Sequence, residues 1–433
     1  MSRPDTVVLL AAGQGTRMKL GGPKVLAPLC GRPMIAWVVE QALALDPARI
    51  LVVVGHGGEQ VRAVVEALDT GGRVRCVEQP EQRGTGHAVQ MCLPELGADP
   101  GLVVLLYGDM PLLTRESIAR LCAAQAETRG GAAILTATPR DPRGFGRIVR
   151  DAGGELKRIV EQRDATPDEL AIREVNLGVY AFPGADLVRL LPTLTNENAQ
   201  GEYYVTDVIA ALVDEGKRVE VRGIADEAEA IGVNTLAHLA EARSAIQLRI
   251  LGEHMAAGVR IEDPASTYID HGVTIGAGTT VLPCTVIRGG VSIGEHCEVG
   301  PFTHLRPGTV LEDGAEVGNF TEAKNSRVGQ HSKAKHLSYL GDARIGARVN
   351  IGAGTIFANY DGTHKHACDV EDRSFIGSGT VLVAPVRVGE GATTGAGAVV
   401  TRGSEIPAGA TWVGVPARPI GSRKPSPSPE PGA

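Results

Sequence analysis

The sequence predicts two structural units in one chain: a doubly wound, Rossmann-like α/β domain and a left-handed parallel β-helix of hexapeptide repeats, joined by a helix. Apolar strand-like runs alternate with helical patterns up to about residue 230. Beyond about residue 260, aliphatic residues recur every six positions instead. The composition agrees, because 56 glycines and only 3% aromatic residues suit a core built of small and β-branched side chains.

The α/β unit is expected over residues 1–235. Its Val- and Leu-rich runs are short and continuous, as in parallel strands that helices cover on both faces. The expected strands are 6–13, 50–56, 102–109 and 132–138, and the expected helices are 33–45 and 59–69. Residues 236–258 contain good helix formers and no strand pattern, so they are expected to form the connecting helix.

The β-helix unit is expected over residues 259–420. Nine aliphatic residues from Ile269 to Val317 are spaced six apart, and the pattern continues after phase slips to Phe357 and again from Ile376. Three six-residue turns make a triangular coil with the aliphatic side chains inside, and six to seven such coils are expected. Residues 358–375 break the period and are expected to leave a corner as a loop. The Pro- and Ser-rich residues 421–433 are expected to be disordered.

Composition also limits the class of protein. The net charge of −7 argues against a nucleic-acid or anionic-membrane surface, and no apolar run reaches the roughly 18 residues of a membrane span. The seven cysteines are odd in number and form no CxxC pair, so we expect reduced thiols in a cytoplasmic protein. The apolar run near the N-terminus is expected to be a buried strand and not a signal peptide.

A glycine loop, LAAGQGTRM at 10–18, follows the first expected strand. It matches neither the dinucleotide-binding GxGxxG pattern nor the Walker motif. Gly13 and Gly15 allow a close approach of the backbone to a polyphosphate, and Arg17 and Lys24 can neutralise its charge. The loop therefore predicts a phosphate-handling site.

Asp109, in YGDMP, ends another expected strand, at the carboxyl edge of the sheet where ligands bind in open α/β folds. A carboxylate there suits Mg²⁺ that bridges phosphate oxygens, and Asn234, in GVNT, could supply a second oxygen. The Gly-rich turn QRGTGHA at 82–88 could hold a nucleobase or ribose through backbone groups.

These motifs, with PKVL, GFGRIV, IVEQRDA, EVNLG and NAQGEYYVTD, resemble the bacterial bifunctional N-acetylglucosamine-1-phosphate uridyltransferase/glucosamine-1-phosphate acetyltransferase family over about residues 5–418. The resemblance implies Mg²⁺ held by Asp109 and Asn234, and UMP transfer from UTP to N-acetylglucosamine-1-phosphate with release of pyrophosphate. It implies that UTP and the sugar nucleotide are bound by Leu10, Ala11, Ala12, Gly13, Arg17, Lys24, Gln79, Gly84, Thr85, Tyr107, Gly108, Gly146, Glu161, Asn176 and Asn234.

His336, in HLSYLGDA, interrupts the repeat, and Arg306 and Lys324 lie one to two coils away in sequence. An imidazole near two cations suits proton transfer beside a sugar phosphate. With VNIGAGT and ANYDG, these residues resemble the acetyltransferase half of the same family. The resemblance implies that His336 is the general base and that Arg306, Lys324, Tyr339 and Asn350 bind glucosamine-1-phosphate. It implies that acetyl-CoA is bound by Ala353, Asn359, Tyr360, Ser378, Ala396 and Arg418, and that the chains form a homotrimer.

The sequence departs from the family pattern at three places, one in the α/β unit and two in the β-helix unit. Leu177 stands where the family usually has Thr, so a polar contact near the sugar is expected to be weaker. The chain is shorter by about two coils before Arg306. Gly414 replaces an arginine that contacts coenzyme A in some members, a role in which Arg418 could substitute.

Two other functions are compatible with parts of the sequence. One is a nucleotidyltransferase for another sugar-1-phosphate with a structural or regulatory solenoid, which would not need His336, Lys324, Arg306 and the NYDG loop together. The other is a non-enzymatic solenoid scaffold, which would not need Arg17, Lys24 and Asp109 together.

Overall fold

The structure, a computed structural model, describes residues 3–420 except 14, 16, 17, 20, 56, 57, 70, 129 and 225. Its chain divides into two compact units, and the boundary falls between Ile246 and Gln247, inside the long helix α9 (Leu236–Ala256). The expected connecting helix is therefore present. None of the described helices has the length and apolarity needed to cross a bilayer.

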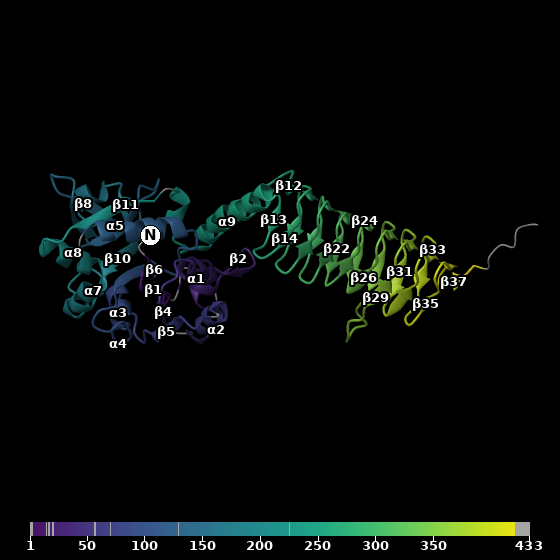
Figure 1. Ribbon diagram of the computed structural model, residues 1–433, viewed down its shortest axis with the longest axis horizontal. Helices are drawn as coiled ribbons and strands as arrows, with labels where there is room; N and C mark the ends of the chain where they lie inside the picture. The colour runs from purple at the N-terminus through teal and green to yellow at the C-terminus, as the bar shows by residue number, and fades with distance from the viewer. Residues whose placement is uncertain are drawn as a thin grey trace, which may run out of the picture. The chain divides into compact units, whose positions relative to one another are not determined.

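Nine described strands of the first unit form one sheet, in the order β11-β7-β10-β6-β1-β4-β5, with β8 and β9 attached beside β10 (Figure 1). The strands are β1 (Thr6–Leu10), β4 (Arg49–Val54), β5 (Val74–Glu78), β6 (Leu102–Tyr107), β7 (Ala132–Ala137), β8 (Arg147–Arg150), β9 (Leu156–Val160), β10 (Val175–Pro183) and β11 (Val219–Gly223). A short hairpin, β2 (Pro28–Leu29) and β3 (Arg32–Pro33), stands apart. All four expected strands are confirmed, each ending one to three residues earlier than predicted.

The sheet is mixed, whereas the sequence predicted parallel strands. β10 runs antiparallel to both of its neighbours, β6 and β7. Like the parallel strands, β10 is buried almost throughout, so its Val-rich pattern gives no sign of its direction.

Helices cover both faces of this sheet. On β1, Val7 and Leu9 pack into one apolar cluster with helices α1, α2 and α5, while Val8 and Leu10 pack into another with α3, α4, α7 and α8. The helices are α1 (Met34–Ala44), α2 (Gly58–Leu68), α3 (Thr85–Gln90), α4 (Leu93–Leu96), α5 (Arg115–Glu127), α6 (Pro167–Leu170), α7 (Gly184–Leu190) and α8 (Thr206–Asp214). The 3₁₀ turns are η2 (Lys24–Leu26), η3 (Leu191–Thr193) and η4 (Glu227–Ala230).

The second unit is a left-handed parallel β-helix with three sheets, here named C, D and E. Sheet C contains β12 (Arg260–Ile261), β15 (Thr280–Val281), β18 (Glu298–Val299), β21 (Glu316–Asn319), β24 (Lys333–His336), β27 (Asn350–Ile351), β30 (Phe375–Ile376), β33 (Thr393–Thr394), β36 (Thr411–Val413) and β37 (Arg418–Pro419). Sheet D contains β13 (Tyr268–Ile269), β16 (Val286–Ile287), β19 (His304–Leu305), β22 (Glu322–Lys324), β25 (Tyr339–Gly341), β28 (Ile356–Ala358), β31 (Val381–Val383) and β34 (Val399–Val400). Sheet E contains β14 (Thr274–Ile275), β17 (Ser292–Ile293), β20 (Val310–Leu311), β23 (Arg327–Val328), β26 (Ala343–Ile345), β29 (Cys368–Val370), β32 (Val386–Val388) and β35 (Glu405–Ile406).

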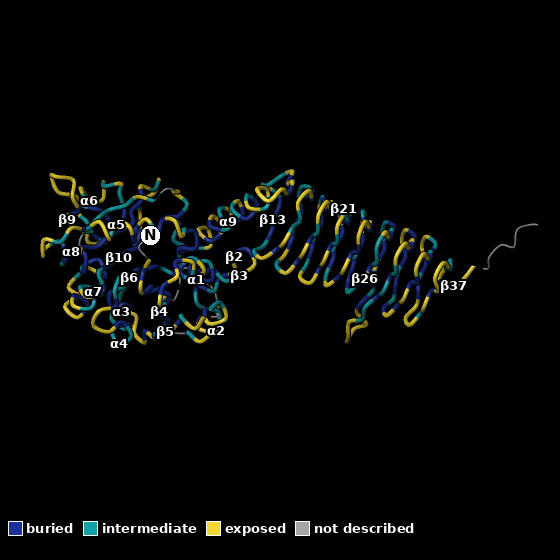
Figure 2. Tube along the Cα trace, in the orientation of Figure 1, coloured by how far each residue is buried: buried dark blue, intermediate teal, exposed yellow. Residues whose placement is uncertain are grey.

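The six-residue period is confirmed, because eight of the nine aliphatic residues from Ile269 to Val317 are buried and Ile275 is half-buried, and Figure 2 shows buried and exposed residues alternating around each turn. Two expectations were wrong in detail. Sheets D and E each hold eight described strands, so the coil has about eight turns and not six or seven. The break in the period is also shorter, because Cys368–Val370 already pairs with β26 and β32; the loop is confined to residues 359–367, here called the arm.

Buried Ser and Thr hydroxyls cross-link successive coils. Thr303 donates its hydroxyl to the Gly318 carbonyl at 2.7 Å, and Thr279 donates to the Gly294 carbonyl at 2.8 Å. Both side chains are almost fully buried. Because a buried hydroxyl without a partner costs about 1–3 kcal/mol, these bonds also specify how one coil stacks on the next.

Candidate functional site

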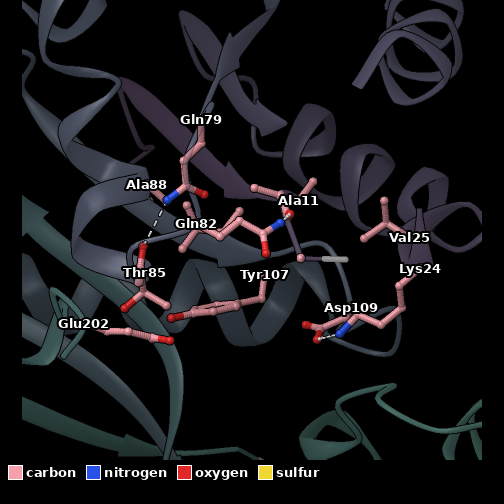
Figure 3. A pocket seen from close by; sticks show the side chains of 14 residues that line it. Ala11, Lys24, Val25, Gln79, Gln82, Thr85, Ala88, Tyr107, Asp109 and Glu202 are labelled. Carbon is pink, nitrogen blue, oxygen red and sulfur yellow. Dashed lines mark hydrogen bonds and ion pairs between the residues drawn. The ribbon is translucent and has the colours of Figure 1, made fainter. Parts of the chain in front are cut away.

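A cleft of about 320 Å³ opens in the first unit at the carboxyl ends of β1 and β6 (Figure 3). It is lined by Leu10, Ala11, Ala12, Gly13, Lys24, Val25, Gln79, Gln82, Gly84, Thr85, Ala88, Tyr107, Asp109 and Glu202. The glycine loop, the Gly-rich turn and the Asp109 loop, which lie far apart in the sequence, therefore meet around one cavity. This edge of the sheet is the place where the sequence predicted a ligand.

One cation position lies at the Asp109 end of the cleft, between Asp109 and Asn234. The Lys24 ammonium donates to Asp109 Oδ2 at 2.6 Å and to Asn234 Oδ1 at 2.9 Å, and Figure 3 shows Lys24 and Asp109 pointing toward each other. The Val233 amide donates to the Asp109 carbonyl at 2.8 Å, which joins the two loops directly. The two oxygens predicted to bind a metal thus converge on a single point.

Glu229, which the sequence analysis missed, strengthens this junction. Its carboxylate is buried and accepts hydrogen bonds from the amide and hydroxyl of Thr114 and from the hydroxyl of Ser117. Thr114 follows Asp109 by five residues, and Glu229 precedes Asn234 by five. The contact therefore fixes the Asp109 loop to the Asn234 segment, and no local pattern in either segment indicated it.

Gln79 lies at the opposite end of the cleft, beside the Gly-rich turn. Its side-chain nitrogen donates to the Gly84 carbonyl at 3.2 Å and lies 3.1 Å from His87 Nδ1. Gly84 has a φ of +104°, and a Cβ there would stand 2.5 Å from the Tyr203 carbonyl oxygen, so only glycine fits. Gln82 reaches across and donates to the carbonyl of Ala12 in the glycine loop.

Tyr107 forms the floor between these two ends. Its ring packs against Gly178, where a Cβ would stand only 2.7 Å from Tyr107 Cε2 and where φ is +78°. Burial, together with the nearby Glu161 carboxylate, raises the pKa of Tyr107, and its hydroxyl bonds to Thr85. The hydroxyl therefore remains protonated at neutral pH.

The three other residues predicted for the sugar lie next to Tyr107 and not among the lining residues above. The Asn176 amide donates to the Gly146 carbonyl at 2.9 Å, and its side chain donates to the Tyr180 hydroxyl at 2.6 Å. Desolvation, then the Asp164 carboxylate, raises the pKa of Glu161. A hydrogen-bonding wall that includes one carboxyl group thus adjoins the cleft.

The remaining predicted residues of this half fall in three places. Gly108 supports the floor through its amide, which donates to the Leu10 carbonyl at 2.9 Å. Leu177 is buried in the apolar cluster with Val175 and Val179. Arg17 lies outside the described residues. Besides Glu229, the sequence analysis missed Val25, Gln82, Ala88 and Glu202 as lining residues; PKVL and QRGTGHA contain three of them but gave no sign of which side chains face inward.

In the second unit, His336 and three predicted acetyl-CoA residues form one vertical column where sheet C turns into sheet D. The carbonyls of His336, Ala353 and Ser378 accept from the amides of Gly354, Gly379 and Gly397, each one coil further on. His336, Ala353, Ser378 and Ala396 therefore occupy equivalent positions of four successive coils. His336 and Ser378 are exposed.

Arg306 and Lys324 lie at the other edge of sheet D, where it turns into sheet E. Lys365, from the arm, and then Arg306 lower the pKa of Lys324, so three cations gather there. Arg306 is paired with Glu322 at 2.7 Å, and Glu322, then Tyr339, raises the pKa of Arg306. Lys365 was not predicted, because its position depends on how the arm folds back.

The arm leaves this same corner and projects beside β29 (Figure 1). Asn359, at its base, is buried and donates to Asp342, while Tyr360 is exposed. Asp361 accepts from the amides of His364 and Thr363 and is paired with His366 at 2.8 Å and with Arg402 at 3.2 Å. These contacts hold the arm in a defined conformation against its own coil.

The structure does not bring all predicted acetyltransferase residues together within one chain. Lys324 pairs with Gly341, at the end of β25, whereas His336 precedes that strand. Residues 338–341 span roughly 10 Å at about 3.3 Å per residue, so the His336 column and the cation cluster lie at opposite edges of sheet D. Asn350 starts β27 in sheet C, and Arg418 lies in β37, paired with Val413 of β36.

Comparisons with known proteins cover both units. Residues 7–203 match the family model described as the MobA-like NTP transferase domain, and residues 369–402 match the hexapeptide repeat of succinyl-transferase. Proteins named "Bifunctional protein GlmU" from Burkholderia mallei and Burkholderia pseudomallei are 46% identical over 429 residues, which cover 91% of this chain and 93% of each relative. The GlmU protein of Burkholderia multivorans is also 46% identical, over 430 residues.

An identity of this size, over nearly the whole length of both chains, spans the cleft and the coiled unit together. It does not favour a nucleotidyltransferase for another sugar with a merely structural solenoid. The chain therefore belongs to the GlmU family of bifunctional N-acetylglucosamine-1-phosphate uridyltransferases/glucosamine-1-phosphate acetyltransferases.

Proposed function

We propose that the two activities of this bifunctional enzyme of UDP-N-acetylglucosamine biosynthesis are divided between the two units. The cleft of the first unit joins UTP to N-acetylglucosamine-1-phosphate, and the second unit acetylates glucosamine-1-phosphate with acetyl-CoA. The observation that carries the first assignment is the convergence of Asp109 and Asn234 on one cation position beside a glycine loop. The second assignment rests on the column that begins at His336.

The residues at that cation position fit Mg²⁺. Asp109 and Asn234 would supply two oxygen donors, one of them a carboxylate, and would leave room for water and phosphate oxygens, which is how Mg²⁺ is usually held. Within the described residues, no cluster of three or more His, Cys, Asp or Glu side chains is suited to hold a metal, which agrees with a site completed by substrate. When bound, Mg²⁺ would supply positive charge to the phosphates of UTP.

The chain's own residues then perform positioning and charge neutralisation. Gly13 and its neighbours let backbone amides approach the phosphates. The Lys24 ammonium, which would turn from Asp109 and Asn234 toward the phosphates, neutralises charge that builds up at the α-phosphorus. Tyr107, Glu161 and Asn176 orient the sugar so that its phosphate oxygen attacks in line and pyrophosphate leaves. No covalent intermediate with the protein is required.

In the second unit, His336 takes a proton from the amine of glucosamine-1-phosphate as that nitrogen attacks the acetyl carbonyl; the C–S bond of the thioester breaks and coenzyme A leaves as the thiol. Arg306, Lys324 and Lys365 supply the positive charge that holds the sugar phosphate, with Tyr339 and Asn350 as further contacts. Acetyl-CoA is proposed to lie along the column of Ala353, Ser378 and Ala396, and to meet Asn359, Tyr360 and Arg418.

Because these groups lie at opposite edges of one sheet, we propose that a site is completed by two chains of a homotrimer. Three exposed apolar side chains next to the His336 column support this: Phe302, Phe320 and Leu337 are 50, 59 and 63% exposed. The two rings stack with centroids 5.1 Å apart. An apolar ridge of this kind is typical of a contact with another chain, and threefold packing would bring one chain's ridge to a neighbour's cation cluster.

The test separates the two activities by two substitutions. Asp109→Ala is expected to lower UTP-dependent pyrophosphate release by roughly 10²–10³-fold or more, because the phosphates lose a charge-organising group, and to leave acetyl transfer unchanged. His336→Ala is expected to lower acetyl transfer by about 10²–10⁴-fold and to leave pyrophosphate release unchanged. Release of pyrophosphate and of free coenzyme A are measured with each substrate omitted in turn. Loss of both activities by either single change in a folded protein would contradict the assignment.

A further inference from the structure

The orientation of the Gln79 side chain in the cleft is fixed by the protein itself. A carbonyl oxygen can only accept a hydrogen bond, so the Gln79 atom that lies 3.2 Å from the Gly84 carbonyl must be the amide nitrogen. The Gly84 carbonyl cannot turn away, because it also accepts from the Ala88 amide at 3.2 Å within α3. A flipped amide would place two acceptors against each other.

This orientation also determines which His87 tautomer is present. The same Gln79 nitrogen lies 3.1 Å from His87 Nδ1, and its second hydrogen points there. His87 Nδ1 must therefore be the acceptor, so the neutral ring carries its proton on Nε2. Both hydrogens of the Gln79 amide are consequently used inside the protein, by Gly84 and by His87.

What remains to face a ligand is the Gln79 carbonyl oxygen. Gln79 is only 3% exposed, yet it lines the cleft, and in Figure 3 its nitrogen points toward α3 while its oxygen points into the cavity. A bound base would remove this acceptor from water, so the ligand must then supply a donor, because leaving the acceptor unpaired costs about 1–3 kcal/mol. Uracil offers an N–H at ring position 3, whereas cytosine has an acceptor there.

We propose that His87 is a positioning residue that sets the base specificity of the cleft, by holding Gln79 so that it presents only an acceptor to the nucleobase. The inference rests on the proposed function and deepens it, since it assigns the choice of UTP over CTP to a residue behind the site. Without the His87 acceptor, the second N–H of Gln79 is left unpaired, and only the contact with the Gly84 carbonyl opposes a rotation that would turn this N–H toward a ring nitrogen such as that of cytosine. The site then discriminates less strongly between UTP and CTP.

The test compares His87→Leu with His87→Asn. Leu cannot accept a hydrogen bond, whereas the side-chain oxygen of Asn can replace Nδ1 as an acceptor. The measurements are kcat/KM for UTP and for CTP with Mg²⁺ and N-acetylglucosamine-1-phosphate, and the dissociation constants of the two nucleotides by equilibrium dialysis. We expect His87→Leu to lower the UTP-to-CTP ratio by roughly tenfold in both measurements, and His87→Asn to retain most of it.

Acetyl transfer and the thermal unfolding midpoint of the same preparations show whether each variant is folded. A ratio unchanged in His87→Leu, or equally reduced in both variants, would overturn the inference. The unsubstituted protein separates this from failure of the proposed function: absence of UTP-dependent pyrophosphate release there would refute the function, whereas an unchanged ratio beside normal release refutes only the role of His87.

Discussion

The two proposed sites of this chain differ in how complete each is within a single polypeptide. The cleft of the first unit gathers loops from several strands around one cavity, and its polar groups are already paired with one another, as Lys24 is with Asp109 and Asn234. The coiled unit instead holds the His336 column and the cation cluster at opposite edges of sheet D. A doubly wound sheet directs its loops to one edge, whereas a solenoid repeats the same position coil after coil. The first architecture can build a site alone, and we propose that the second is completed by a neighbouring chain.

The largest expected effect tests this difference by mixing chains. Co-expression of a His336→Ala chain with a Lys324→Ala chain should restore acetyl transfer to about a quarter of the normal level, because about one in four interfaces then joins two intact halves. The measurement is coenzyme A release by purified mixed trimers.

The matched control mixes Arg306→Ala with Lys324→Ala chains. Both residues belong to the same cation cluster, so no interface in that mixture carries an intact cluster and activity should stay lost. If neither mixture regained activity, or both did, a site shared in this manner would be excluded. Uridylyl transfer should remain normal in every mixture.

A medium effect is expected where the cleft depends on a single glycine. Gly178→Ala should destabilise the first unit by about 2–4 kcal/mol, because the new Cβ meets the Tyr107 ring at 2.7 Å and the residue has a positive φ. It should also raise KM for the sugar phosphate. Gly216→Ala is the control, since Gly216 has a similar φ of +75° with no atom within 4 Å of the added Cβ.

Chemical unfolding gives the loss of stability in each variant. Both variants carry the backbone strain of a positive φ, so the difference between their losses is the cost of the clash with the Tyr107 ring. Equal losses of stability and an unchanged KM in the two variants would show that Tyr107 is not held in place by Gly178. Acetyl transfer is expected to stay normal in both below the unfolding transition.

The smallest effect concerns Glu161, whose pKa in the folded state is raised by desolvation and by Asp164. A carboxyl with a raised pKa destabilises the fold when it is ionised, and this penalty disappears as the pH falls through the folded pKa toward the ordinary value of about 4.3. Glu161→Gln should therefore raise the unfolding midpoint by about 1–2 °C at pH 7 and not at pH 4, while it weakens sugar binding.

Glu197→Gln removes the same charge from an exposed loop position and serves as the control. Scanning calorimetry at both pH values decides the comparison. An equal gain for both variants at pH 7 would attribute the effect to net charge and not to the surroundings of Glu161.

The repeats were predictable because each coil obeys a local rule. Aliphatic residues six apart, such as Ile287, Ile293 and Val299, are buried as predicted. The arm was predicted too long because Val370 resumes the coil only six residues before Ile376, and one matching residue inside a polar stretch is a weak signal. The antiparallel direction of β10 was also missed, because a strand buried on both faces has the same composition in either direction.

By itself, the sequence determined the two units, the glycine loop and the residue types that can handle phosphates and protons, since these follow from short-range periodicity and from motifs. Only the tertiary structure decided how those groups face one another. Lys24 contacts Asn234, which lies 210 residues away in the sequence, and Glu229 contacts Thr114, which lies 115 residues away. The side-chain amide of Gln79 is oriented by the Gly84 carbonyl and the His87 imidazole at the start of α3. Such contacts depend on where the backbone brings distant segments together, and no local pattern in the chain records that.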